Sequence, residues 1–97
     1  MARVRLREAA RRDLADILDY SIERFGAAVA EAYMNGFTAA FAGLGDQPRM
    51  GVVLENIRPP VHCLIYRSHR IFYDIQDDTV WIVRILHVAM DARSRLR

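Results

Sequence analysis

Residues 61–88 read VHCLIYRSHRIFYDIQDDTVWIVRILHV, and this stretch decides the fold. Three runs rich in β-branched and aromatic residues, 61–67, 70–76 and 79–88, are separated by two polar links of two residues each. Runs of this composition favour strands, and links this short join neighbours that run antiparallel. The stretch therefore predicts a three-stranded antiparallel meander.

The last run, 79–88, is apolar on both of its predicted faces. Alternation places Trp81, Val83 and Ile85 on one face and Val80, Ile82 and Leu86 on the other. A sheet with one wet face should instead alternate apolar with polar residues. Because helices can cover only one face, we expect either the linker and the tail of this chain, or another chain, to cover the second.

Upstream of the meander, the apolar period changes to that of a helix. Residues 8–25 and 27–44 each carry an apolar stripe with charged residues elsewhere on the wheel, as amphipathic helices do. Gly26 between them suits a helix end and a sharp turn, which predicts an antiparallel helical hairpin. The residues expected in the core are Leu14, Ile17, Phe25, Tyr33, Phe37, Phe41, Phe72, Trp81, Val83 and Ile85.

Shorter elements are predicted at the two ends of the chain and in the link before the meander. Val4 and Leu6 alternate with arginines, which indicates an edge strand over residues 3–7. Residues 52–57 are a candidate short strand, and Asp91 is placed to cap a last helix over residues 92–97. The predicted fold is α+β, a single domain over residues 1–97: an antiparallel sheet of three to four strands packed against an N-terminal antiparallel helical hairpin, in the order β-α-α-β-β-β.

Composition narrows the class of protein. The chain has 97 residues, 53% apolar and 27% charged, which is the range of globular domains. Its one cysteine, Cys63, excludes an internal disulfide, and no spacing of His and Cys indicates a metal or cofactor site. No apolar run is long enough to cross a bilayer, and residues 1–8 lack the apolar stretch of a secretory signal. We therefore expect a cytoplasmic protein without a membrane partner.

Charge is distributed in blocks along the chain. Residues 1–12 carry five arginines against one glutamate, and residues 13–46 carry six acidic residues against one arginine. All 14 basic residues are arginine, and the pI is near 9.1. Guanidinium groups favour two-pronged contacts with carboxylate or phosphate, so the pattern permits a nucleic-acid or an acidic-protein partner.

One set of residues has the types that a ribonuclease needs: a base, an acid and cations that bind phosphate. Glu55, Arg70 and His87 are the candidates, with Arg93, Arg95 and Arg97 in the tail. The alternative is that His87 is a half-buried strand residue and Arg70 a surface residue. Residue types and spacing alone therefore lead to a small α+β domain that depends on a partner.

Motifs along almost the whole chain resemble those of one toxin family. They are A-x-x-D-L at Ala10, Asp13 and Leu14, I-L-D-Y at 17–20, R-F-G at 24–26, A-x-x-Y at Ala30 and Tyr33, L-x-x-x-P-x-x-G at Leu44, Pro48 and Gly51, S-H-R-I-F-Y at 68–73, and V-R-I-L-H-x-x-M-D at 83–91. As an ordered set, they resemble the ParE-type toxins of the RelE/ParE superfamily, also called the plasmid stabilisation family. These are the toxic halves of bacterial type II toxin–antitoxin modules, and the fold they imply agrees with the one predicted above.

The resemblance also bears on activity. RelE-like members are ribosome-dependent mRNA endonucleases, whereas ParE-like members are understood to poison DNA gyrase without a ribonuclease site. Nucleases resembling YoeB end in His-Tyr, but Val88 follows His87 here. The resemblance therefore implies a gyrase inhibitor that blocks replication and has no catalytic residues. The alternatives are an mRNA interferase that uses Glu55, Arg70 and His87, and a degenerate module that binds antitoxin but is not toxic.

The resemblance further implies partners and contact surfaces. We expect a ParD-like antitoxin in a hetero-oligomer such as a heterotetramer, DNA gyrase as the target, operator DNA bound only through the antitoxin, and no cofactor or metal. Acidic antitoxin residues are expected to meet Arg3, Arg5, Arg7, Arg67 and Arg70, and an antitoxin segment to pair with an exposed strand edge. The expected gyrase surface is Arg84, His87, Met90, Asp91, Arg93, Arg95 and Arg97.

Overall fold

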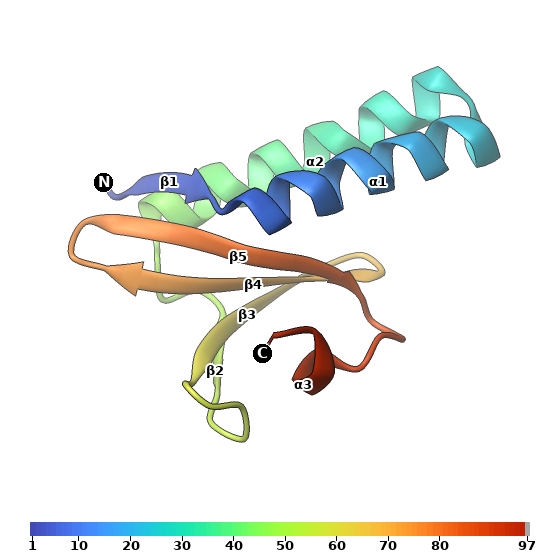
Figure 1. The fold of residues 1–97 in the computed structure, drawn as a ribbon. Coiled ribbons are helices and arrows are strands. Elements are labelled where there is room, and N and C mark those ends of the chain that lie inside the picture. The colour runs from blue at the N-terminus through green and yellow to red at the C-terminus, as the bar shows by residue number, and fades with distance from the viewer. Residues whose placement is uncertain (97) are drawn as a thin grey trace.

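The computed structural model describes residues 1–96 as a helical hairpin laid across one face of a sheet (Figure 1). This arrangement confirms the predicted α+β class and the order of the main elements. The elements are β1 (Arg3–Leu6), α1 (Glu8–Phe25), α2 (Ala27–Asp46), β2 (Val52–Leu54), β3 (Val61–Tyr66), β4 (His69–Gln76), β5 (Thr79–His87) and α3 (Ala92–Arg95).

Within residues 1–96 the sheet has five strands in the order β1-β5-β4-β3-β2. Strands β2 to β5 form the antiparallel part, but β1 runs parallel to β5 with Val4 beside Val80 and Leu6 beside Ile82. The prediction of a three- to four-stranded antiparallel sheet is therefore wrong in strand number and in the direction of β1. Local alternation identifies a strand, whereas its direction follows from the tertiary packing of its apolar side chains.

The alternation of β5 is interrupted in its middle. Phe72 on β4 pairs with Arg84, but the next residue, Tyr73, pairs with Ile82, so Val83 is an extra residue on β5. A bulge of this kind reverses the faces beyond it. Ile85 consequently packs in the same cluster as Val80 and Ile82, and the prediction that it shares a face with Trp81 and Val83 is wrong.

The main core lies between the hairpin and the sheet. Phe37 of α2 is 1% exposed and packs edge-on against Tyr66 of β3, with ring centroids 4.6 Å apart. The Tyr66 hydroxyl donates a 2.9 Å hydrogen bond to the carbonyl oxygen of Tyr33. The Tyr66 side chain lies against α2 at Gly36, where a Cβ atom would overlap the Tyr66 ring. The missing side chain at Gly36 is therefore what allows the hairpin to approach the sheet this closely.

A second, smaller core covers part of the opposite face of the sheet. Ile57 from the linker and Ala92 from α3 are buried there, and Leu96 packs against the same cluster. The sheet contributes Val61, Cys63, Phe72 and Leu86. The sequence left open whether this face is covered by the linker and tail or by another chain. The linker and tail of this chain cover the part around Leu86.

The far end of the hairpin projects beyond the sheet (Figure 1). Phe25, expected in the core, is 59% exposed because no strand lies beneath that end, so this prediction is wrong. Of the other expected core residues, Phe37, Phe72 and Ile85 are buried, and Leu14, Ile17, Tyr33, Phe41, Trp81 and Val83 are partly buried. In the part of the chain that the structure describes, no helix combines the length and the apolarity that crossing a membrane requires.

Candidate partner-binding groove

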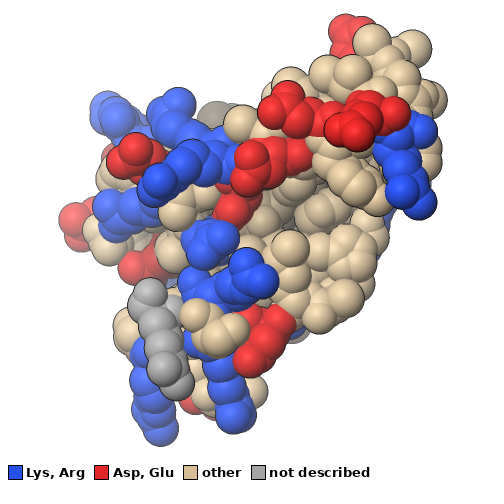
Figure 2. Space-filling view, turned by 45° about the vertical axis from the view of Figure 1, so that its right-hand side comes forward, with Lys and Arg blue, Asp and Glu red and all other residues tan. Residues whose placement is uncertain are grey.

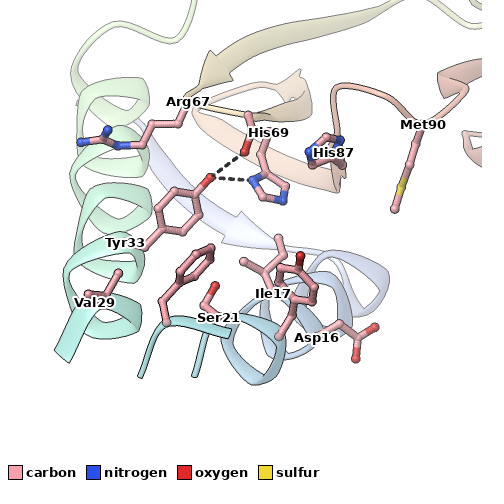
Figure 3. Close-up of a pocket in the computed structure, with 12 residues that line it drawn as sticks. Asp16, Ile17, Ser21, Val29, Tyr33, Arg67, His69, His87 and Met90 are labelled. Atoms are coloured by element: carbon pink, nitrogen blue, oxygen red, sulfur yellow. Dashed lines mark hydrogen bonds between the residues drawn. The ribbon is translucent and has the colours of Figure 1, made fainter. Parts of the chain in front are cut away.

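A groove of about 690 Å³ lies between the projecting end of the hairpin and the sheet edge formed by the β3–β4 turn and the end of β5 (Figure 3). Its helical wall is apolar and open to solvent: Tyr20 is 58% exposed, Phe25 59% and Val29 54%. We call it the hairpin groove. The residues that line it are Asp16, Ile17, Tyr20, Ser21, Phe25, Val29, Tyr33, Arg67, Ser68, His69, His87 and Met90.

Two neighbouring histidines are among the polar residues of the hairpin groove. His69 and His87 are direct neighbours across β4 and β5, with ring centroids 5.5 Å apart. The Tyr33 hydroxyl and His69 Nδ1 share a 2.7 Å hydrogen bond (Figure 3). The Ala89 N–H donates to His87 Nδ1 at 3.1 Å. Burial, and then the nearby His87, lower the pKa of His69. The shift favours the neutral imidazole of His69, which costs less to bury than the charged form.

Charges of opposite sign flank the hairpin groove. Acidic side chains gather along the helical hairpin in Figure 2, and on α1 they include the exposed Asp16, Asp19 and Glu23. On the sheet side, Arg67 stands at the β3–β4 turn with a φ of 53° and is exposed. An apolar hollow with a few convergent polar groups and a charged rim has the character of a site for an amphipathic protein segment.

The residues expected to contact gyrase do not form one surface. Arg84 is engaged within the chain: it pairs with Asp13 of α1 and donates to the carbonyl oxygen of Arg95 at 3.1 Å. Asp91 caps α3 by accepting the Arg93 N–H. His87 and Met90 line the hairpin groove, and Arg93 and Arg95 are exposed on α3. Arg97 lies outside the described residues.

The arginines expected to contact antitoxin fall into two groups. Arg3, Arg5 and Arg7 lie on β1, which pairs with the start of β5, and Arg7 stacks 4.2 Å over the Trp81 ring. Arg67 lines the hairpin groove at the opposite end of the sheet. Arg70 lies near it but donates a 2.6 Å hydrogen bond to the carbonyl oxygen of Met90, so it helps to hold the tail.

The three residues of the nuclease alternative are not brought together. Arg70 pairs with Leu86, which packs in the second core, whereas His87 lines the hairpin groove on the helical side of the sheet. Their side chains therefore point to opposite faces. Glu55 follows β2, which ends beside Val61 at the start of β3, while Arg70 lies beside Ile65 near the end of that strand.

Most residues of the groove wall were not predicted from the sequence to be part of a binding site. Phe25 and Tyr33 were expected in the core, and Val29 lies on the apolar stripe of the second helix. The signal in the sequence is that Tyr20 and Ile22 are apolar but lie off the stripe of α1, so the apolar arc is wider than one sheet can cover. Both side chains are exposed in the structure.

Comparison with known proteins supplies the family. The family model described as "ParE toxin of type II toxin-antitoxin system, parDE" matches residues 4–92. The chain belongs to the ParE toxin family. It is 36% identical over 92 residues to Toxin ParE1 of Caulobacter vibrioides, covering 95% of each chain. It is 33% identical over 96 residues to Toxin ParE1 of Mycobacterium tuberculosis, covering 98% of each.

A solved structure supports the fold of this ParE-family chain. A chain of the "Chromosomal ParDE TA system from P. aeruginosa" superposes with a TM-score of 0.77, covering 90% of this chain and 96% of that one. Its sequence identity is 19%, so the likeness shows the fold alone. The predicted resemblance to ParE-type toxins is confirmed, and this ParE-family chain is the toxin of a ParDE-type toxin–antitoxin system.

Proposed function

We propose that a ParD-like antitoxin neutralises this toxin by placing an amphipathic segment in the hairpin groove, and that the free toxin inhibits DNA gyrase in the cytoplasm and so blocks replication. The observation that carries the first part is the row of exposed apolar side chains on the wall of a groove that residues 1–96 leave open. Exposed apolar surface gathered in one hollow marks a protein-interaction site.

The chemistry of the groove specifies the segment that it would take. An apolar stripe would pack on Tyr20, Phe25 and Val29, because burying such side chains provides most of the binding energy. Basic residues of the segment would face Asp16, and an acidic residue would face Arg67, which favours one orientation. We expect the assembly to be a hetero-oligomer such as a heterotetramer.

The gyrase part rests on family membership and on the separation of the nuclease residues. Acid–base catalysis needs its groups within hydrogen-bond reach of one substrate, and Arg70 and His87 face opposite sides of the sheet. We therefore propose that toxicity depends on a binding surface and not on a catalytic residue. Arg93 and Arg95 on α3 are exposed arginines of the predicted gyrase surface whose side chains form no ion pair within residues 1–96.

The antitoxin part is tested by charge insertion in the groove. Val29→Asp should weaken antitoxin binding at least tenfold, because a carboxylate would be desolvated against apolar groups. Ile65→Asp is the matched control, since Ile65 is 66% exposed and lies outside the groove. Equal affinities of the two variants, measured by isothermal titration calorimetry, would place the antitoxin elsewhere.

The gyrase part is tested by inducing the toxin without antitoxin. Growth arrest with DNA-damage signalling, stalled supercoiling and intact mRNA is the expected result, and His87→Gln should remain toxic. Arg93→Glu with Arg95→Glu should reduce toxicity, while Arg24→Glu with Arg49→Glu should not. Cleaved mRNA with intact chromosomes would instead establish the interferase, and unimpaired growth would establish the degenerate module.

A further inference from the structure

The N-terminal end of the molecule carries a dense group of arginines that the fold does not use for internal ion pairs. Arg3, Arg5 and Arg7 alternate with Val4 and Leu6, whose side chains pack against the main core, so the three guanidinium groups share the outer face of β1. The strand leads directly into α1, whose first turns add Arg11 and Arg12. We call these five exposed residues the N-terminal arginine surface.

The N-terminal arginine surface has no carboxylate partners within the described chain. The one salt bridge among residues 1–96 joins Arg84 to Asp13, and Glu8 is the single acidic residue within the ten positions from Arg3 to Arg12. Figure 2 shows basic side chains gathered at the left of the molecule, with a few acidic side chains among them. The surface is therefore mainly positive, with Glu8 and the neighbouring Asp78 as its nearby acidic residues, and its arginines can meet an anionic partner without first breaking internal ion pairs.

The chemistry around these arginines indicates which anionic partner fits. A protein interface needs an apolar centre, and of the large apolar side chains exposed in residues 1–96 only Met1 belongs to this end of the chain. Trp81, the large ring beside β1, is partly buried, with the Arg7 guanidinium stacked 4.2 Å above it. Surfaces that bind nucleic acid are instead polar, wet and strongly positive.

We propose that the N-terminal arginine surface binds the phosphate backbone of duplex nucleic acid. Guanidinium groups bind phosphate in a two-pronged manner, and arginines two positions apart on one strand face recur at regular intervals, as phosphates do along a duplex strand. Binding is independent of base sequence, because backbone contacts carry no sequence information. This differs from the expectation that DNA is reached only through the antitoxin, and it goes beyond the proposed function.

The test measures salt dependence with the purified full-length chain and no antitoxin or gyrase. Anisotropy of a fluorescein-labelled DNA duplex of about 20 base pairs should show binding whose log K falls with log[salt] at roughly −0.9 per phosphate contacted, or about −4.5 for five arginines. Arg3→Gln, Arg5→Gln and Arg11→Gln together should make the slope shallower by about 2.7. Arg7 is left intact to preserve its contact with Trp81.

The control variant removes the same charge elsewhere. Arg24→Gln, Arg49→Gln and Arg58→Gln are also exposed, and together they should leave the slope within about 1 of the parent value. The proposal is overturned if the duplex does not bind at low salt, or if both triple variants change the slope equally. It is also overturned if the parent chain binds no duplex and the triple variant of Arg3, Arg5 and Arg11 weakens antitoxin affinity tenfold. The arginines would then contact an acidic protein instead of nucleic acid. Each of these failures leaves the proposals for the hairpin groove and gyrase standing.

Discussion

Asp13 and Arg84 lie 71 positions apart in the sequence and form a two-pronged ion pair, with Nε to Oδ2 at 2.8 Å and Nη2 to Oδ1 at 2.9 Å. Asp13 Oδ2 also accepts the backbone N–H of Ile85 at 2.8 Å, on β5 beyond the last residue that pairs with β1. Arg84 Nη1 continues to the Arg95 carbonyl oxygen. One carboxylate thus connects α1, the unpaired edge of β5 and, through Arg84, the tail.

Asp13→Asn should therefore cost about 2–3 kcal/mol of unfolding free energy, because it leaves a partly buried guanidinium without its counter-charge. Asp19→Asn, an exposed change on the same helix, should stay within about 0.5 kcal/mol. Urea denaturation of both variants checks the difference. Equal losses would mean that the Asp13–Arg84 pair contributes no more than an exposed charge.

Two phenylalanines of the hairpin should behave in opposite ways. Phe37→Ala removes a side chain that is 1% exposed, and should cost about 3–5 kcal/mol of stability through the cavity that it leaves. Phe25→Ala acts on a ring that is 59% exposed, and should change stability by about 0.5 kcal/mol or less. Phe25→Ala should nevertheless weaken antitoxin binding. Thermal melts and antitoxin titrations together separate the two roles, and a large loss of stability for Phe25→Ala would refute the assignment.

Two glycines of α2 provide a matched test of close packing. Gly36→Ala would drive a methyl group into the Tyr66 ring, and should cost about 1–3 kcal/mol despite the better helix propensity of alanine. At Gly43, the new methyl would meet only the flexible end of Met50, at 3.2 Å from its Cε. Gly43→Ala should be neutral, or stabilising by up to about 1 kcal/mol. If both changes had the same effect on the urea midpoint, Tyr66 would not hold α2 in place.

Stability should fall as the solution becomes mildly acidic. Burial lowers the pKa of His69 and of His62, with His87 adding to the shift of His69 and Arg49 to that of His62. Each imidazole then binds its proton more readily in the unfolded chain, so folding stability is complete above the unfolded pKa of about 6.5 and declines as the pH falls below it. Urea midpoints at pH 7.5 and 5.5 should differ, and the difference should shrink in His69→Gln with His62→Gln. An unchanged difference would assign the effect to other groups.

Features set by local periodicity were predictable from the sequence. The helix over residues 8–25 has the predicted bounds, since the change from a period of two to a helical period and Gly26, with φ of 87°, mark its ends. The strands of the meander and the Asp91 cap are also confirmed. These features depend on residues that are close together in the sequence, so the spacing of apolar and polar residues is enough to predict them.

Features set by distant contacts were not predictable. Nothing near Val83 indicates that it would be the extra residue of β5, because the bulge is defined by the register with β4. Phe25 has the helical phase of a core residue, but its burial depends on where the sheet ends. The hairpin groove was missed for the same reason, although three of its lining residues, His87, Met90 and Arg67, had been singled out.

The parallel pairing of β1 with β5 has a consequence for synthesis in the cell. Strand β1 is synthesised first but cannot pair until β5, the last strand, has been made, because Arg3 to Leu6 pair with Thr79 to Ile82. The apolar face of the hairpin likewise finds its cover only when β3, β4 and β5 have emerged. Contacts between the two ends of a chain are slow to form, and apolar surface stays exposed until they do. The toxin therefore acquires its shape only once nearly all of it has left the ribosome, which gives an antitoxin already present time to meet it as it folds.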